Sequence, residues 1–285
     1  MQKITYINEK GKSVNFTNFE PYFLQSITGT GVTNSTTQTQ RSPYQDGETF
    51  IDTSLNKRFI DLSVVIFTKT HEDVYEKRRN LANIFNPKLK GQLIYTNDYT
   101  TKVIDVRVDN GVVFGRTTAN RQECMISLTA YNPFWLDDFV TGTVFSFNIP
   151  LFEFTFELTE AGYELQSDGT NRTTLNNIGD VPTPVEIEFS GAALKPRITN
   201  ETTGEFIEVD ANIPAGSKLI ISTEFGNKKV LIDNGSTVTN AFNQINLDST
   251  FFNLEVGKNN IVYTAETGID TASVLIRFTS RYLGV

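Results

Sequence analysis

The sequence predicts a mainly β protein, with an N-terminal β-sandwich-like domain that carries one α-helix and a C-terminal jelly-roll β-sandwich. Three observations lead to this prediction. Short runs rich in Val, Ile, Phe and Tyr alternate with polar residues at period two. Gly, Asn and Pro separate these runs at close intervals, which is typical of turns between antiparallel strands. The chain has 285 residues, which is long enough to bury two cores.

Strands are expected throughout the first half of the chain. The turn at residues 8–11 joins two short alternating runs, which predicts an opening hairpin. A later run is long and rich in Ile, Val and Phe, and the last two runs of this half alternate at period two. The expected strands of the first half are residues 2–7, 13–16, 58–68, 92–96, 102–108 and 122–131.

One segment of the first half, residues 70–86, has helical spacing instead. Thr70 can cap the first turn, Asp73 stands in the capping-box position, and Pro87 ends the segment. Polar residues fall on the opposite side from the apolar face, which predicts an amphipathic helix laid on a sheet. The apolar face carries Val74, Leu81 and Phe85, with Arg78 beside them.

The second half predicts a succession of short strands separated by turns such as Asn234-Gly235. Many short strands with regular turns are typical of a sandwich or jelly-roll. The expected strands are residues 143–149, 151–158, 184–190, 195–199, 205–209, 218–222, 229–233, 260–265 and 272–278. The motif NPFW at 132–135 ends the first half. We therefore expect a boundary within residues 136–142 and two domains, 1–139 and 140–285.

Charge divides the chain at the same place. Residues 1–139 contain 16 Lys and Arg against 15 Asp and Glu, a net charge of +1. Residues 140–285 contain 9 against 18, a net charge of −9, and the two halves together give the formal charge of −8. This difference suggests two surfaces with different neighbours, although drift between two solvated domains explains it as well.

Composition excludes several kinds of site. With one His (His71) and one Cys (Cys124), the chain can form neither a His/Cys zinc cluster nor an internal disulfide. A Ser-His-Asp enzyme would have to use His71, whose place at a helix start favours a surface role. The pI of about 4.9 argues against a protein that mainly grips a phosphate backbone. The apolar runs are short and no signal-peptide pattern opens the chain, so we expect no membrane span and synthesis in a cytoplasm.

Three local patterns could carry chemistry, and each has a simpler explanation. The GTG run at 29–31 resembles the start of a dinucleotide-binding fingerprint without its third Gly, so a tight bend or a close backbone approach explains it better. Glu186 and Glu188 are expected roughly 6.6–7 Å apart on one strand face, which fits an inverting glycosidase pair. Exposed carboxylates on a half-buried strand explain the pair more simply. Residues 168–171 suit a turn better than a calcium loop.

A family resemblance is carried by seven motifs of the first half. They are QSITGTG at 25–31, RSPYQDGETF at 41–50, RFIDL at 58–62, YEKRRNL at 75–81, NPK at 86–88, GQLIYTN at 91–97 and YNPFW at 131–135. In this order and spacing, the first half resembles the distal tail proteins of long-tailed phages that infect Gram-positive hosts.

The second half is similar to the same family. NIGDVPTP at 177–184 looks like the family's Asn-x-Gly-Asp start of a carboxy-terminal sandwich. Residues 196–204, GSKLII at 216–221 and NLEVGKN at 253–259 look like later landmarks. One departure is Val256, because the family often has Pro before this Gly. The departure weakens the match of that turn but not the register of the second half.

The resemblance implies a non-enzymatic structural protein of the virion, at the tip of the phage tail. Such proteins form a homohexameric ring, single or double, with a galectin-like C-terminal sandwich that projects outward. The implied partners are the tail tube protein, a tail-associated lysin or tail fibre, and a receptor-binding protein. DNA would pass through the ring lumen only as cargo. The resemblance implies no cofactor, no metal and no direct membrane contact.

The residues themselves suggest where a ring would close. Residues 33–40 are rich in Thr and Gln and low in charge, so they could pair across subunits by strand addition. Heterologous contacts of this kind close into rings when the rotation allows. A disordered loop is the alternative reading of the same composition. We therefore expect ring-interface residues among Gln40, Asp46, Gly47 and Arg58.

Two other function classes stay open. A carbohydrate-binding host-adhesion protein would need exposed aromatic platforms on the second domain, whereas the single Trp, Trp135, lies at the expected domain junction. A cell-wall hydrolase would need a carboxylate pair such as Glu186 and Glu188. We rank the structural hub first, the adhesion protein second and the hydrolase third.

Overall fold

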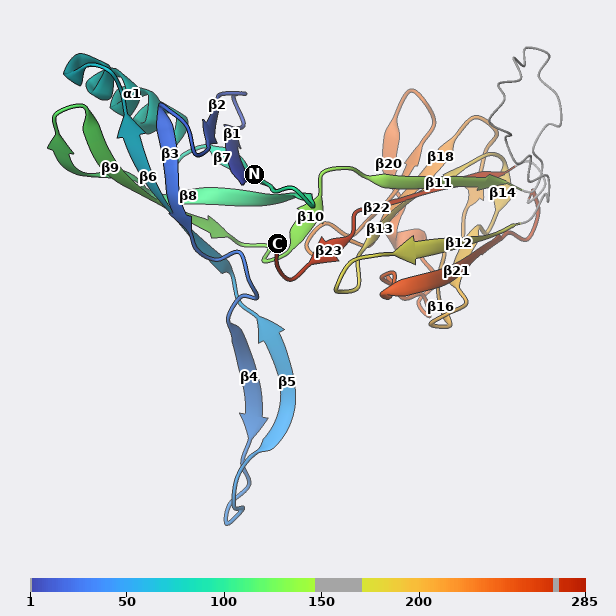
Figure 1. Ribbon diagram of the computed structural model, residues 1–285. Coiled ribbons are helices and arrows are strands. Elements are labelled where there is room, and N and C mark those ends of the chain that lie inside the picture. Colours follow the sequence, from blue (N-terminus) through green and yellow to red (C-terminus); the bar gives the residue numbers. More distant parts are fainter. Residues whose placement is uncertain (1, 147–170, 269–271) are drawn as a thin grey trace. The chain divides into compact units, whose positions relative to one another are not determined.

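The structure is a computed structural model that describes residues 2–146, 171–268 and 272–285 (Figure 1). The chain divides into two compact units. Unit 1 comprises Met1–Asp138 together with Arg281–Val285, and unit 2 comprises Phe139–Ser280. The chain thus leaves unit 1 after Asp138 and returns to it for its last five residues, a return that no pattern in the sequence had indicated.

Unit 1 is built on one curled antiparallel sheet with the strand order β2-β1-β7-β8-β9-β6-β3. The edge strands β2 and β3 meet at Thr17, whose N–H donates to the Tyr22 carbonyl at 3.3 Å and whose carbonyl accepts from Leu24 N at 2.8 Å. The sheet therefore closes on itself around a single core. Its strands are β1 (Lys3–Asn8), β2 (Ser13–Phe16), β3 (Tyr22–Ile27), β6 (Arg58–Phe67), β7 (Lys90–Thr96), β8 (Thr101–Thr118) and β9 (Arg121–Ala130).

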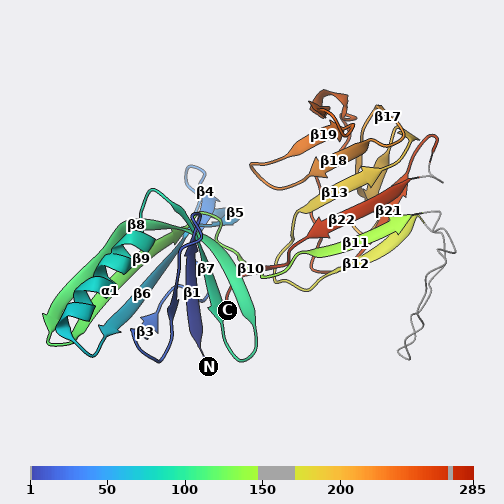
Figure 2. The same ribbon diagram turned by 90° about the horizontal axis from the view of Figure 1, so that it is seen from above.

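Helix α1 (His71–Ile84) lies over this sheet, as Figure 2 shows from above. Its start follows the predicted capping, because the Thr70 side chain accepts a hydrogen bond from Asp73 N at 3.3 Å. Leu81 is fully buried, and Phe85, just past the helix end, stacks on Tyr6 with ring centroids 4.2 Å apart. The amphipathic helix expected over residues 70–86 is therefore confirmed, and its apolar face joins the unit 1 core.

Between β3 and β6 the chain forms a hairpin of β4 (Ser35–Gln40) and β5 (Thr49–Leu55), which we call the arm. Among the described strands, β4 and β5 pair only with each other. Figure 1 shows that the arm leaves the sheet of unit 1 at the end opposite α1. Polar composition had left residues 33–40 open between a strand that pairs across subunits and a disordered loop. In the structure, β4 pairs instead with β5 of the same chain.

Two short strands complete unit 1. In the sequence they lie on either side of unit 2: β10 (Trp135–Asp137) precedes it and β23 (Arg281–Tyr282) follows it. They pair antiparallel with each other, and β10 also pairs with β8. The two points at which the chain leaves and rejoins unit 1 are therefore hydrogen-bonded neighbours.

Unit 2 is a β-sandwich, because two antiparallel sheets bury one common core of side chains that includes Phe189 and Tyr263. One sheet has the order β11-β22-β13-β18-β19-β20: Thr141–Ser146, Ser273–Phe278, Val185–Ser190, Lys218–Ser222, Lys229–Asp233 and Val238–Asn240. The other has the order β12-β21-β15-β16: Arg172–Asn177, Gly257–Thr264, Arg197–Asn200 and Glu205–Glu208. A smaller pair joins β14 (Ala193–Leu194) to β17 (Asn212–Ile213), and a 3-10 turn, η1, spans Phe242–Gln244.

The predicted fold class is confirmed. The protein is mainly β, with an N-terminal sheet domain and a C-terminal β-sheet domain, and α1 is the only α-helix among the described residues. The strand expected at residues 151–158 and most of the calcium-loop alternative at 168–171 lie outside the residues that the structure describes.

Candidate functional site

Most side chains of the arm are exposed, and the arm has no packed core. Every residue of β4 is exposed, and in β5 the side chains of Phe50 and Ile51 are exposed to 63% and 54%. Polar side chains bridge the two strands, since Thr37 and Thr53 are hydrogen-bonded at 3.3 Å and Thr39 donates to Glu48. A hairpin without a packed face is marginal alone in water. The arm therefore offers a long surface that a partner can cover.

A β-bulge shapes one side of the arm. The register shifts between Gln38 and Thr39, so that Gln38 pairs with Asp52 and Thr39 pairs with Phe50. Ile51 is the extra residue on β5 and is left without a cross-strand partner in this register. Two exposed apolar side chains, those of Phe50 and Ile51, thus sit at the bulge of an otherwise polar hairpin.

Three of the four expected ring-interface residues lie at the far end of the arm. Gln40 is the last residue of β4 and pairs with Thr49. Asp46 and Gly47 belong to the connecting turn, where Gly47 has φ +77°, a conformation that favours glycine. The structure places these three residues at the exposed tip of the arm, Gln40 at the end of β4 and the other two in the turn. That they contact another subunit stays a prediction.

Arg58, the fourth expected interface residue, is buried inside unit 1, with only 1% of its surface exposed. Its guanidinium donates to carbonyls of Pro133 at 2.7 Å, Gly29 at 2.7 Å, Leu283 at 2.8 Å and also Gly31. Burial lowers the pKa of this group, yet an arginine with four carbonyl partners keeps its charge. Arg58 therefore holds separate segments of its own subunit together at the base of the arm, and that it also contacts another subunit stays a prediction.

The glycine run at 29–31 serves this base and not a nucleotide. Gly29 has φ +80°, and a Cβ atom there would lie 2.0 Å from the carbonyl oxygen of Phe59. Only glycine permits this approach of two backbone segments. The interpretation as a close backbone approach is confirmed at Gly29, and the carbonyls of Gly29 and Gly31 both accept hydrogen bonds from Arg58.

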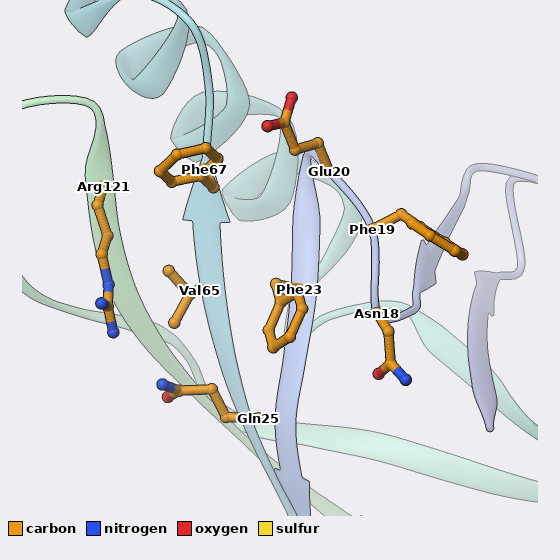
Figure 3. Close-up of a pocket in the computed structure, with 8 residues that line it drawn as sticks. All are labelled: Asn18, Phe19, Glu20, Phe23, Gln25, Val65, Phe67 and Arg121. Atoms are coloured by element: carbon orange, nitrogen blue, oxygen red, sulfur yellow. The ribbon is translucent and has the colours of Figure 1, made fainter. Parts of the chain in front are cut away.

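An apolar pocket of about 680 Å³ lies on the outer face of β3 and β6, and Figure 3 shows the side chains that line it. Phe23 from β3 and Phe67 from β6 are each about 40% exposed, and Phe19 is exposed to 64%. Glu20 and Arg121 supply the charged side chains of the lining, and Arg121 forms an ion pair with Glu123 at 3.3 Å. This lining suits packing against another protein and offers no paired acid and base for catalysis.

In unit 2, cationic side chains neutralise the carboxylates of Glu186 and Glu188. Arg277 contacts both carboxylates at 3.3 Å, and Lys218 Nζ lies 2.6 Å from Glu188 Oε1. The hydrogen bond from Lys218 lowers the pKa of Glu188, so this group stays ionised and is unsuited to act as a general acid. The explanation as strand-face carboxylates therefore fits the geometry better than a glycosidase pair.

The other residues noted in the sequence also have structural places. His71 Nδ1 contacts the Ala119 carbonyl at the exposed start of α1, and Cys124 is buried, which raises the pKa of its thiol to about 12. Trp135 is fully buried in β10 of unit 1 and cannot serve as a sugar platform. Within the described ranges, no group of three or more His, Cys, Asp or Glu residues is arranged to hold a metal ion. No helix there is long and apolar enough to cross a membrane.

Two protein-family models match the chain, one in each half. Residues 9–123 match the phage tail protein RIFT-related domain, and residues 178–282 match the C-terminal domain of the siphovirus-type tail component. A comparison with curated proteins finds no match.

Solved structures share the fold over the whole chain. The crystal structure of the Dit (gp 19.1) protein of phage SPP1, described as a paradigm of the hub adsorption apparatus in Gram-positive infecting phages, has a TM-score of 0.69 at 13% identity and covers 98% of both chains. A chain of the phage P2 baseplate in its activated conformation with Ca has a TM-score of 0.56 at 13% identity over 100% of both chains. At these identities, the likeness shows the fold alone.

Proposed function

This chain belongs to the siphovirus-type distal tail protein family, whose members are structural hub components of phage tails, and we propose that it forms a homohexameric ring that joins the tail tube to the tail tip. The observation that carries the proposal is the order of the two family matches. A tail domain at residues 9–123 is followed on the same chain by a tail-component C-terminal domain at 178–282. As a phage tail component, the protein is part of the virion.

The proposed ring closes through the arm. The polar, fully exposed strand β4 and the bulge at Ile51 on β5 give each subunit a projecting element that has an unfilled surface. Such an element fits a heterologous contact, in which the arm of one subunit lies on a different surface of the next, and contacts of this type close into rings. Gln40, Asp46 and Gly47 are the proposed contact residues at the arm tip, and Arg58 is a positioning residue at its base.

The proposed partners follow from the same role. The ring would stack under the tail tube protein through unit 1 and present unit 2 outward to a tail-associated lysin, a tail fibre or a receptor-binding protein. DNA would cross the lumen only as cargo. The carbohydrate-binding alternative gains no support from Trp135, whose ring is buried.

Light scattering on the purified chain tests the ring. Six copies of 32.0 kDa give 192 kDa for a single ring, and a double ring gives twice that mass. A variant in which residues 35–55 are replaced by a short Gly-Ser turn should remain monomeric, because the proposed contact is gone. The far-UV circular dichroism of this variant, and the protection of its unit 1 strand amides from hydrogen exchange, serve as folding controls. Full assembly without the arm would refute the arm contact, and a parent chain that stays monomeric at high concentration would count against the hub.

A further inference from the structure

The arm is joined to unit 1 by a narrow base, which we call the neck. It consists of residues 28–34, which lead into the arm, and residues 56–58, which lead out of it. Apart from the hydrogen bonds of Arg58, two cross the neck, from Asn56 N to the Asn34 carbonyl at 2.9 Å and from Thr33 Oγ1 to the Lys57 carbonyl at 3.3 Å. Because the arm has no packed core, the neck determines where the arm points.

Arg58 ties the two sides of the neck together. It is the first residue of β6 and the last residue of the outgoing side, and its guanidinium binds carbonyls of Gly29 and Gly31 on the incoming side. The same guanidinium also binds the carbonyl of Leu283. A segment more than 220 residues away in the sequence, Arg281–Val285, thus takes part in closing the neck.

This segment, which we call the strap, also touches the neck through its own backbone. Val285 N donates to the Thr30 carbonyl at 3.0 Å. A Cβ atom added to Gly284 would lie 3.0 Å from the Thr30 carbonyl oxygen and 3.4 Å from the Gly31 Cα. The incoming side of the neck is therefore held between Arg58 and the strap, and the closeness of that contact depends on a glycine.

The strap is anchored firmly at its other end. Tyr282 pairs with Trp135 in the β10–β23 ladder, and its hydroxyl donates to Asp137 at 3.2 Å. Asp137 in turn accepts from Lys102 at 2.5 Å, and Lys102 Nζ lies 3.4 Å from the centre of the Tyr282 ring. Lys102 and Asp137 are each 9% exposed, so this ion pair is little screened by solvent.

We propose that the strap is a brace that sets the arm in the orientation needed for ring assembly. The neck has few contacts of its own, whereas the strap combines a ladder, a buried ion pair and the shared Arg58 guanidinium. A subunit whose strap has not docked carries a loosely held arm and assembles poorly. Since the strap follows unit 2 in the chain, a subunit becomes competent for assembly only after unit 2 has been synthesised. This inference rests on the proposed ring function.

Hydrogen exchange and oligomer mass of the full chain test the brace. Gly284→Val should push the strap away from Thr30 and raise the exchange rates of amides in residues 28–34 by about 10-fold or more. Hydrogen exchange is measured below the protein concentration at which the parent assembles. The measured amide protection then arises from contacts within a single subunit. At higher concentration, light scattering should show ring assembly weakened by about 10-fold or more.

Gly31→Ala is the matched control, because an added Cβ at Gly31 meets nothing within 4 Å. It should change neck exchange and assembly less than about 2-fold. If Gly284→Val lowers protection throughout the unit 1 sheet, the smaller Gly284→Ala decides instead. Unchanged neck exchange in the deciding variant, or an equal effect of Gly31→Ala, overturns the brace. A parent chain that never assembles overturns the ring, while the exchange comparison still tests whether the strap holds the neck.

Discussion

The arm and the neck adjoin in sequence but are stabilised in different ways. The strands of the arm are exposed and joined by polar side chains, such as the Thr37–Thr53 pair. The neck is closed by Arg58, a buried charge whose four carbonyl partners come from three separate segments. The neck is therefore a base held by contacts within the subunit, whereas the arm has no packed core of its own. A fixed base with an uncommitted surface is the arrangement that a projecting assembly element requires.

The largest expected effect comes from breaking the neck. Arg58→Met should lower the free energy of unfolding of unit 1 by about 3–5 kcal/mol, because four part-buried carbonyls lose a buried, charged donor. Urea unfolding followed by the fluorescence of Trp135, which lies in unit 1 beside Arg58, measures this change.

Arg41→Met on the arm is the matched control for that substitution. Arg41 is exposed and donates to the Gln45 carbonyl at 3.1 Å, so its loss should change stability by less than about 0.5 kcal/mol. Equal effects of the two substitutions would remove the contrast between neck and arm.

The sequence predicted those elements that follow local patterns and did not predict the form of the arm. Helix α1 and strand β18 follow local patterns of capping and alternation, and both were predicted within two residues of their ends. The arm follows no such pattern, since β4 has no buried face and so no alternation between apolar and polar residues. Its hairpin form depends on pairing with β5, and polar composition alone could not separate that pairing from disorder.

The role of Arg58 could not be predicted for a different reason. Its acceptors at Gly29, Pro133 and Leu283 are backbone carbonyls, which carry no side-chain signature, and they come from distant parts of the chain. The glycine run at 29–31 was the one usable signal, because it indicated a close backbone approach, which the structure places at Phe59 near the start of β6. The return of the chain to unit 1 at Arg281 had no local signal, since β23 has only two residues.

A smaller effect is expected from the carboxylates of unit 2, which form ion pairs nearer to solvent than Arg58. The Lys218 hydrogen bond holds the folded pKa of Glu188 below the ordinary pKa of a Glu side chain. Glu188 therefore contributes stability above that pH, and the contribution is lost as the pH falls through the lowered folded pKa. Glu188→Gln should cost about 0.5–1 kcal/mol at pH 7 and flatten the acid side of the stability curve.

Thermal unfolding of both proteins between pH 2 and pH 7 measures this difference. The two curves should converge at the acid end, where Glu188 is protonated in the folded and unfolded states alike. A difference that grows as the pH falls would contradict the assignment of Glu188 as a stabilising anion.

The smallest effect on stability is expected at the bulge of the arm. Substitution there should weaken ring assembly far more than it lowers the free energy of unfolding. Replacing Phe50 and Ile51 together by Ser removes exposed apolar surface, so the free energy of unfolding should change by less than about 0.5 kcal/mol. If these side chains pack against the next subunit, ring assembly should weaken by about 10-fold or more, as light scattering over a dilution series would show.

Phe225→Ser supplies the control, because Phe225 is 91% exposed on unit 2 and lies outside the arm. Its replacement removes similar apolar surface and should leave assembly unchanged if the contact belongs to the arm. Equal weakening by Phe225→Ser would assign the effect to general surface hydrophobicity. A stability loss above about 1 kcal/mol in the arm variant would mean that Phe50 and Ile51 serve their own subunit, because exposed side chains rarely contribute that much. The contrast between the neck, which is held within the subunit, and the arm, which is free to contact another subunit, therefore depends on one result. Replacing Phe50 and Ile51 must weaken ring assembly without lowering the free energy of unfolding.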